Sequence, residues 1–119
     1  VGKGDNEVQE GIQKAISKIL SPPVLIAVTS AVTPEDDFRE MEDYAATACS
    51  VQNLVLSLWD QGIGAQWSTG GITRSDFVYR ALEISPVKEK IVGFLKAGYP
   101  AAIPQREKKS ITEIREYLP

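Results

Sequence analysis

One stretch, residues 43–71, constrains the fold of this chain more than any other part of the sequence. It reads DYAATACSVQNLVLSLWDQGIGAQWSTGG, and its apolar and small residues recur at the three- and four-residue spacing of a helix. These residues cover more of the circumference than the single stripe of a surface helix, so we expect a helix that is buried on most sides. Gly62 is placed to end this helix in a left-handed cap, and Gly64 adds a second permissive residue to the turn.

The last five residues of this stretch combine a large aromatic side chain, two hydroxyl groups and two glycines; they are Trp67, Ser68, Thr69, Gly70 and Gly71. Glycines allow a backbone to approach a flat ligand closely while its N–H groups remain free to donate. Taken alone, the residues favour an ordinary buried strand followed by a glycine turn. Contact with a flat ligand is the alternative.

The residues before this stretch predict a helix and a strand. Residues 7–20 repeat apolar side chains at helical spacing, which predicts an amphipathic helix that ends at Ser21-Pro22-Pro23. Residues 24–29, VLIAVT, form a continuous run typical of a strand buried on both faces, and we expect a central strand. Thr33 and Pro34, a cap residue and a first-turn proline, predict the start of a helix.

The residues after it predict a short helix and another strand. Residues 73–76 resemble a capping box, which predicts a helix to about Leu82. Residues 90–97 predict a strand, in which Gly93 indicates a bulge or a close approach by another backbone. The elements lack the regular alternation of a parallel doubly wound sheet, so we expect an α+β fold with helices packed on a largely antiparallel sheet. With no repeat or internal linker, residues 1–119 are expected to form a single domain.

Composition excludes several classes of site. With no histidine and a single cysteine, Cys49, the chain lacks an internal disulfide, the usual zinc sites and Ser-His or Cys-His nucleophile pairs. A net charge of −3 gives no electrostatic reason to expect nucleic acid, and no apolar run approaches the roughly 20 residues that cross a bilayer. We interpret the acidic residues between 35 and 43 as a solvated helix start and expect no metal. A cytoplasmic protein without nucleic-acid or membrane partners is expected.

The order of residues around the long helix resembles the FMN-dependent nitroreductase family. The pattern is a helix of small residues, Gln52-Asn53-Leu54, an apolar run, Gly62-Ile63-Gly64, and then Trp67 with small polar residues and glycine. Residues 22–28, 90–95 and 98–100 agree in order and spacing, so the resemblance covers nearly the whole chain. It implies a nitroreductase-like, dimeric α+β fold with FMN as the cofactor.

The resemblance also implies roles for individual residues. It favours contact of Trp67, Ser68 and Thr69 with the flavin ring and ribityl chain, with Gly70 and Gly71 leaving room for them. Arg106 and Lys108 occupy the first two basic places of a segment that resembles the family's KxRxPLEEV. A phosphate monoester is well matched by paired cations, and a solvated basic turn is an equal alternative. No catalytic side chain is expected, because a flavin itself carries the redox chemistry.

Two features depart from the family pattern. Glu83 stands where family members usually have glycine, so the turn there is expected to differ locally. The chain begins at Val1 without a counterpart of the family's arginine-rich segment, which grips the FMN phosphate. We therefore expect the carboxy-terminal part of a nitroreductase-like domain.

The function implied by the resemblance is NAD(P)H-dependent reduction of nitroaromatics, quinones or similar electron-poor acceptors through FMN. The alternative is a non-catalytic flavin-binding or interaction module of the same fold. We expect a homodimer in which the small residues Ala45, Ala48 and Cys49 lie near the two-fold axis. Gln52 and Asn53 are expected to be hydrogen-bonded to a neighbouring strand or to a partner helix, with ligand contact as the alternative. Cys49 is expected to pack inertly among alanines.

Overall fold

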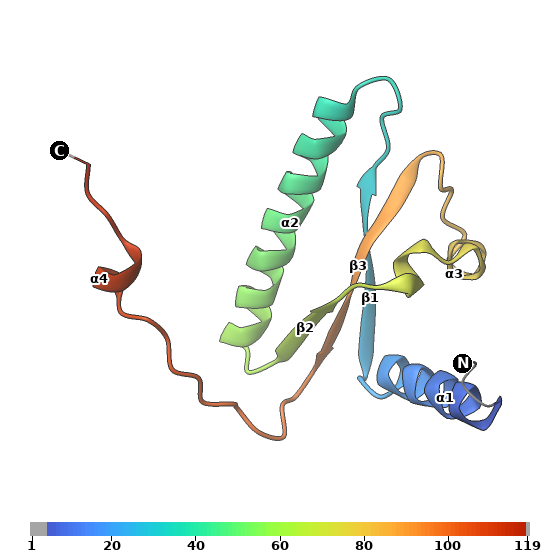
Figure 1. Cartoon of the computed structure of the whole chain (residues 1–119), viewed down its shortest axis with the longest axis horizontal. Helices are drawn as coiled ribbons and strands as arrows, with labels where there is room; N and C mark the ends of the chain where they lie inside the picture. The colour runs from blue at the N-terminus through green and yellow to red at the C-terminus, as the bar shows by residue number, and fades with distance from the viewer. Residues whose placement is uncertain (1–4, 119) are drawn as a thin grey trace.

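The computed structural model describes residues 5–118 of the chain. Figure 1 shows a long helix on one side of a small sheet and the other helices away from it. The elements in chain order are α1 (Asp5–Leu20), β1 (Val24–Ala31), α2 (Asp37–Asp60), β2 (Gly64–Ser68), the 3-10 helix η1 (Gly71–Arg74), α3 (Asp76–Ala81), β3 (Glu89–Gly98) and α4 (Ile111–Ile114). The two described chain ends lie on opposite sides of the molecule.

The sheet is antiparallel, and its strand order is β1-β3-β2. This confirms the expected α+β class with an antiparallel sheet. The expectation that residues 24–29 form the central strand is wrong for the described sheet, because only β3 has a hydrogen-bonded neighbour on both sides. Accordingly β3 contains most of the core, including Leu95 with 0% of its surface exposed, whereas Val24 and Leu25 on β1 are exposed. An apolar run shows that a strand can be buried but does not fix its place in a sheet.

A β-bulge interrupts the pairing of β1 with β3. Val28 pairs with Gly93 and Thr29 pairs with Ile91, so Val92 is the extra residue on β3. The Ile91 N–H donates to the hydroxyl of Tyr79, at 2.8 Å from nitrogen to oxygen. The expectation of a bulge or a close approach at Gly93 is confirmed, although the group that approaches is a side chain, described below. The bulge thus ties α3 to the start of the central strand.

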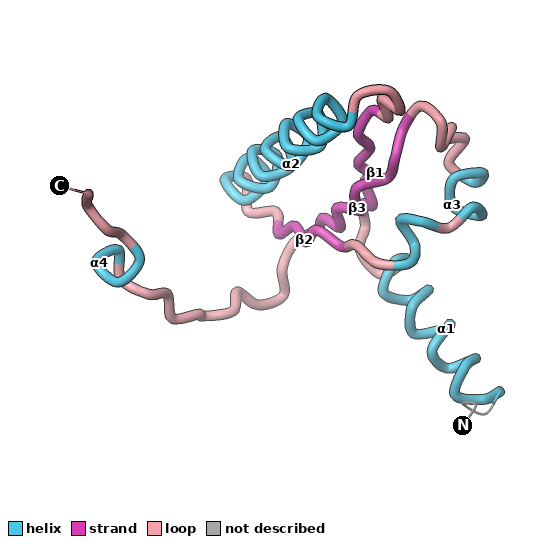
Figure 2. Tube along the Cα trace, turned by 45° about the horizontal axis from the view of Figure 1, so that its top comes forward, coloured by secondary structure: helices cyan, strands magenta, loops and turns pink. Residues whose placement is uncertain are grey.

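The long helix α2 packs one side against β1 and β2, and α1 and α3 lie beyond the other side of the sheet (Figure 2). Val51 is buried on the inner side of α2. The outer side is an exposed stripe that recurs at helical spacing: Phe38, Met41, Ala45, Cys49, Gln52, Leu56 and Trp59. The expectation that this helix is buried on most sides is therefore wrong for the single chain, because a three-stranded sheet offers only one surface to cover it.

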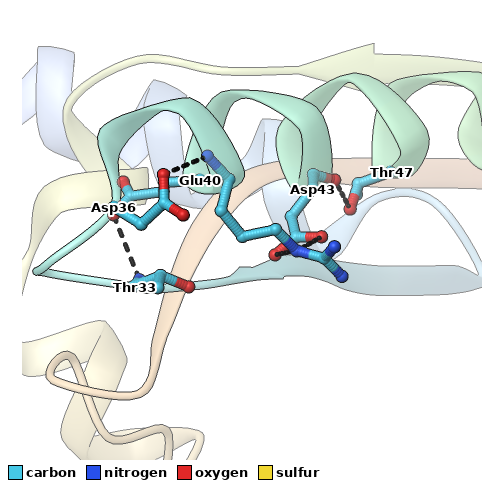
Figure 3. Close-up of polar contacts among 6 residues, drawn as sticks. Thr33, Asp36, Glu40, Asp43 and Thr47 are labelled. Carbon is cyan, nitrogen blue, oxygen red and sulfur yellow. Dashed lines mark hydrogen bonds and ion pairs between the residues drawn. The ribbon is translucent and has the colours of Figure 1, made fainter.

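The start of α2 lies later than the sequence indicates. Asp36 is the N-cap, and its carboxylate accepts a hydrogen bond from the Arg39 N–H at 2.9 Å. Thr33 lies in the preceding turn, where its N–H donates to Glu40 Oε2 at 3.3 Å (Figure 3). The carboxylates of Asp36 and Glu40 thus accept hydrogen bonds from backbone N–H groups at or near the start of the helix. Thr33 was predicted to begin the helix, but the carboxylate of Asp36 takes that role.

Two helix ends have the Schellman geometry. After α2, Gly62 has φ +75°, its N–H donates to the Trp59 carbonyl, and the Ile63 N–H donates to the Leu58 carbonyl. This confirms the predicted left-handed cap. After α3, Glu83 has φ +56° and occupies the position that Gly62 has after α2. The Glu83 N–H donates to the Arg80 carbonyl, and the Ile84 N–H donates to the Tyr79 carbonyl. In this chain the turn is thus a Schellman cap in which glutamate adopts the conformation that glycine favours, and the expected difference from family members stays a prediction.

The remaining segments carry little of the core. The predicted helix from Thr73 to Leu82 is divided into η1 and α3, with Ser75 between them as the N-cap of α3. Beyond β3, residues 99–118 are exposed and extend away from the sheet, and α4 is their one helical turn (Figure 1). Within the described residues, no helix has the length and apolar character needed to cross a bilayer.

Candidate functional site

The face of the sheet opposite α2 carries a hollow of about 910 Å³. It lies between the end of α1, the strand β2, η1 and the second half of β3. Successive strand residues point to opposite faces, so Gln66 and Ser68 on β2 share this face with Phe94 and Lys96 on β3. Pockets that hold organic ligands have comparable volumes. This hollow is the candidate site.

The predicted ligand-contacting segment is divided between the two faces of the sheet. Ser68 and Thr69 line the hollow, whereas Trp67, Gly70 and Gly71 are not among its lining residues. The strand period explains the division, because Trp67 must face away from the hollow if Ser68 faces into it. The structure therefore brings two of the five predicted residues to the hollow.

Trp67 lies against the central strand on the α2 side. An added Cβ on Gly93 would overlap the indole Nε1 and lie 2.5 Å from Cδ1. The Nε1 atom is buried and has no hydrogen-bond partner among the described residues. This arrangement fits the alternative interpretation of Trp67 as an aromatic anchor of the core.

Gly70 forms the turn between β2 and η1. Its φ of +125° and ψ of −162° lie in a region that side chains other than glycine rarely adopt. The Gly70 carbonyl accepts hydrogen bonds from the N–H of Thr73 at 3.1 Å and from its hydroxyl at 2.8 Å. Apart from Gly70 and its two chain neighbours, no atom of the described residues lies within 4 Å of an added Cβ at this position. The backbone conformation explains the glycine within this chain, and its role in ligand contact stays a prediction.

Arg106 and Lys108 lie outside the hollow, on the exposed segment that follows β3. The structure does not bring them together with Ser68 and Thr69 within the described chain. Their proposed role as phosphate ligands stays a prediction.

Sequence reasoning missed two lysines that line the hollow, Lys18 from the last turn of α1 and Lys96 from β3. None of the residues that line the hollow is Asp or Glu within the described range. A signal for Lys96 existed, because it interrupts the apolar run Phe94-Leu95-Lys96-Ala97 of a predicted strand. Lys18 carried no such signal, since charged residues are common at the end of an amphipathic helix.

A second charged cluster joins α2 to β3 on the other face. The Glu40 carboxylate pairs with the Lys90 ammonium, which also lies 6.0 Å from the centre of the Tyr44 ring. The hydrogen bond from Lys90, together with that from the Thr33 N–H, lowers the pKa of Glu40 below its ordinary value of 4.5. We interpret this cluster as a tie between the start of the long helix and the start of the central strand.

The outer side of α2 also exposes three residues that the sequence analysis discussed. Cys49 is an exposed free thiol, so the expectation that it packs among alanines is wrong in the single chain. Gln52 and Asn53 are exposed as well, and their hydrogen bonding to a partner helix stays a prediction. Among residues 5–118, no group of three or more His, Cys, Asp or Glu side chains is arranged to hold a metal ion.

Comparisons with known proteins agree with this fold. The sequence model of the nitroreductase family matches residues 6–99. Over 82 residues the chain is 33% identical to "Putative NAD(P)H nitroreductase YfhC" of Bacillus subtilis (strain 168), covering 69% of this chain and 41% of that protein. It is 29% identical over 91 residues to "Putative NAD(P)H nitroreductase YdjA" of Escherichia coli (strain K12), covering 76% of this chain and 49% of that protein. The chain thus spans less than half the length of these curated relatives.

Two solved structures have similar folds. A nitroreductase-like family protein from Bacillus cereus superposes with a TM-score of 0.78 at 28% identity, covering 98% of this chain and 62% of that one. A protein from Desulfovibrio desulfuricans, described as "a putative nitroreductase in complex with fmn", gives a TM-score of 0.64 at 24% identity, covering 82% of this chain and 56% of that one.

Proposed function

Because this chain belongs to the nitroreductase family, we propose that it contributes the hollow beside β2 to the FMN site of an oxidoreductase. The observation that carries the proposal is the presence of Ser68 and Thr69 in a hollow of about 910 Å³ on the sheet. These are the hydroxyl residues that the family pattern assigns to flavin contact. The similar proteins named above include one described in complex with FMN, which supports the choice of cofactor.

The residues that line the hollow fit a flavin in size and chemistry. Phe94 and Ile72 give an apolar wall for a flat ring, and Ser68, Thr69 and Gln66 give hydrogen-bonding groups beside it. A negatively charged ligand also meets no carboxylate among the described lining residues. Ser68 and Thr69 are therefore proposed to orient the ring, and the apolar wall to exclude water from one of its sides.

FMN, when bound, would supply the redox chemistry, which is hydride transfer from NADH or NADPH and reduction of an acceptor such as a nitroaromatic or a quinone. The chain itself needs to supply binding and orientation, and we assign no acid or base. The names of the two curated relatives support NAD(P)H as the reductant.

We also propose that a second copy of the chain covers the exposed stripe of α2. Five of its seven residues, Phe38, Met41, Ala45, Leu56 and Trp59, are apolar and exposed in the single chain. Large apolar surfaces of this kind are typical of interaction sites, and a two-fold dimer presents the same surface from both copies.

The function is tested by reconstituting the purified protein with FMN and recording its visible spectrum before and after anaerobic addition of NADH or NADPH. We expect retained yellow colour that bleaches with one of the nucleotides and returns with a quinone. Yellow protein that does not bleach would support the non-catalytic flavin-binding module instead. Protein that retains no flavin would contradict the proposal. A Ser68→Ala/Thr69→Val variant is expected to retain less FMN at an unchanged thermal midpoint.

A further inference from the structure

The strand β2 carries residues for both faces of the sheet. Trp67 pairs with Leu95 and faces α2, whereas the next residue, Ser68, faces the hollow. The strand has five residues and, in the described sheet, β3 as its one neighbour. Because the strand is short and paired along one edge, side-chain packing on one face helps to fix where the residues of the other face lie.

The indole of Trp67 reaches beyond its own cross-strand partner. It lies on the backbone of Gly93, two residues from Leu95, where an added Cβ would overlap Nε1 and lie 2.5 Å from Cδ1 and 3.0 Å from Cε2. Aromatic side chains can make such diagonal contacts in antiparallel pairs. The buried Nε1 has no hydrogen-bond partner among residues 5–118, so the ring is held by packing and not by a hydrogen bond.

The pairing of β2 with β3 ends where the indole lies. Ser68 belongs to the last pair, and one further step would pair Thr69 with Gly93 on the α2 face. Since the Cβ atoms of paired residues lie about 4.5–5.5 Å apart, a Thr69 side chain on this face would meet the ring that covers Gly93. The strand ends at Ser68 instead, and Thr69 lines the hollow.

The hollow therefore receives residues that a regular strand would not give it. A regular strand presents every second residue to one face, whereas Ser68 and Thr69 are consecutive and both line the hollow. The turn at Gly70, with φ +125°, then brings Ile72 of η1 to the same hollow. The change of direction begins at the residue that follows the last β2 pair.

We infer that Trp67 is a positioning residue of the site. By covering Gly93, its indole ends β2 after Ser68 and directs Thr69 to the hollow, and it acts on the ligand only through these two residues. The inference deepens the proposed function and rests on it for the identity of the ligand, a flavin. It differs from the sequence-based prediction, which gave Trp67 a direct contact with the flavin.

The test moves the ring without changing any residue that lines the hollow. Gly93→Ala displaces the indole, Trp67→Phe leaves part of the space above Gly93 empty, and the double variant Trp67→Phe/Gly93→Ala puts a methyl group into that space. The Kd of FMN is measured by quenching of flavin fluorescence, and the thermal midpoint is measured on the same samples. Tyr79→Phe is the matched control, because it removes a hydrogen bond beside the β-bulge and leaves Trp67 and the lining residues unaltered.

Each single variant is expected to weaken FMN binding by about 2- to 10-fold, the range for the loss of one hydrogen bond to the ring. Tyr79→Phe should keep the Kd of the natural sequence although its thermal midpoint falls. The double variant should regain part of the affinity and of the midpoint, because its two changes of volume compensate.

An unchanged Kd in both single variants would overturn the inference and leave Trp67 a residue of the core alone. An equal loss of affinity in Tyr79→Phe would also overturn it, since the loss would then follow from general destabilisation. If Gly93→Ala does not fold, Trp67→Phe takes its place in each measurement.

If the natural sequence binds no flavin, the proposed function fails, and the flavin-free protein then decides the inference separately. The Cα and Cβ NMR shifts of Ser68 and Thr69 report the backbone conformation of these residues. Gly93→Ala is expected to change these shifts, and Tyr79→Phe to leave them as they are in the natural sequence. Unchanged shifts at both residues in Gly93→Ala would overturn the inference.

Discussion

The indole of Trp67 occupies the space that a Cβ on Gly93 would need. Trp67 pairs with Leu95 across the two strands, and Gly93 is the next residue of β3 on the same face. The absence of a side chain at Gly93 therefore lets a large ring lie on the central strand under α2. This contact adds side-chain packing to the backbone pairing of β2 with β3.

Replacement of Gly93 by alanine should destabilise the protein. The Cβ displaces the Trp67 ring, and overpacking of this kind costs about 1–3 kcal/mol in the free energy of unfolding. Urea unfolding measures the change. Gly11→Ala is a suitable control, because an added Cβ at this helical glycine meets no other segment of the described chain within 4 Å and should stabilise the helix slightly. In a Trp67→Leu background the penalty of Gly93→Ala should shrink; an equal penalty in both backgrounds would contradict the contact.

Tyr79→Phe should lower the free energy of unfolding, because it removes a hydrogen bond beside the β-bulge. The hydroxyl of Tyr79 accepts the hydrogen bond of the Ile91 N–H, and its loss leaves a donor at the bulge without an acceptor. The expected cost is about 1–3 kcal/mol, with faster hydrogen exchange of the Ile91 amide. Tyr99→Phe is the matched control, because Tyr99 is 83% exposed and should change stability by less than about 0.5 kcal/mol. Unchanged exchange at Ile91 would show that the hydroxyl is not its acceptor.

Glu83→Gly should stabilise the protein. Glu83 has φ +56°, a conformation that costs a residue with a Cβ about 1 kcal/mol or more and that glycine adopts freely. The greater freedom of glycine in the unfolded chain offsets part of the gain, so we expect about 0.5–1 kcal/mol in the free energy of unfolding. Glu83→Ala removes the same carboxylate but keeps the Cβ, and it should bring no such gain. Equal effects of the two substitutions would assign the change to charge and not to backbone strain.

The pair of Glu40 and Lys90 should make stability depend on pH in acid. The folded chain lowers the pKa of Glu40 below 4.5, so its contribution is present above the unfolded pKa and is lost as pH falls through the folded pKa. The free energy of unfolding of the natural sequence should therefore fall more steeply below about pH 4.5 than that of Glu40→Gln. Glu42→Gln, which removes a carboxylate of the same helix without a salt bridge among residues 5–118, is the control. Parallel curves for Glu40→Gln and the natural sequence would contradict this role.

The exposed stripe of α2 should form a dimer interface. Stable interfaces of this kind bury on the order of 2,000 Å² or more, and a lysine at their centre is unfavourable. We expect sedimentation to give a dimer for the natural sequence and a shift toward monomer for Leu56→Lys. Ser50→Lys, on a different side of the helix, should leave the dimer intact.

The position of Cys49 gives an independent measurement. Cys49 lies at the middle of α2, which spans Asp37–Asp60, so a two-fold axis near the centre of this helix would bring both thiols together. A short bis-maleimide should then link two copies. A folded monomer at micromolar concentration would contradict the interface.

Local sequence signals predicted the carboxy-terminal end of α2 and the fold class. The left-handed cap at Gly62 could be predicted because it depends only on the glycine itself and on the carbonyl groups of the last helical turn. Mixed helices and strands without regular alternation predicted an α+β fold, and the family pattern predicted the same. These features depend on residues close together in the chain, so periodicity and turn chemistry are sufficient to reveal them.

The site could be predicted only in part. Ser68 and Thr69, which the sequence analysis named, line the hollow, and their contact with a flavin stays a prediction. The sequence analysis grouped Trp67 with them, but successive strand residues point to opposite faces, so Trp67 faces away from the hollow. Lys18 and Lys96 were missed because 78 residues separate them along the chain, by subtraction of their numbers, and only the packing of α1 beside the sheet brings them to one hollow. Arg106 and Lys108 were selected by their order in the sequence, which does not specify where an exposed segment lies in space.

The sequence by itself predicted most of the helices and strands and the left-handed cap at Gly62, since local sterics and hydrogen bonding control both. Only the tertiary structure decided that β3 is the central strand, that one side of α2 remains exposed, and that the hollow is positively charged. The physical reason is that burial and charge are properties of surfaces formed by distant segments. An apolar side chain is buried equally well against any apolar surface, so the residue type does not show which segment will cover it.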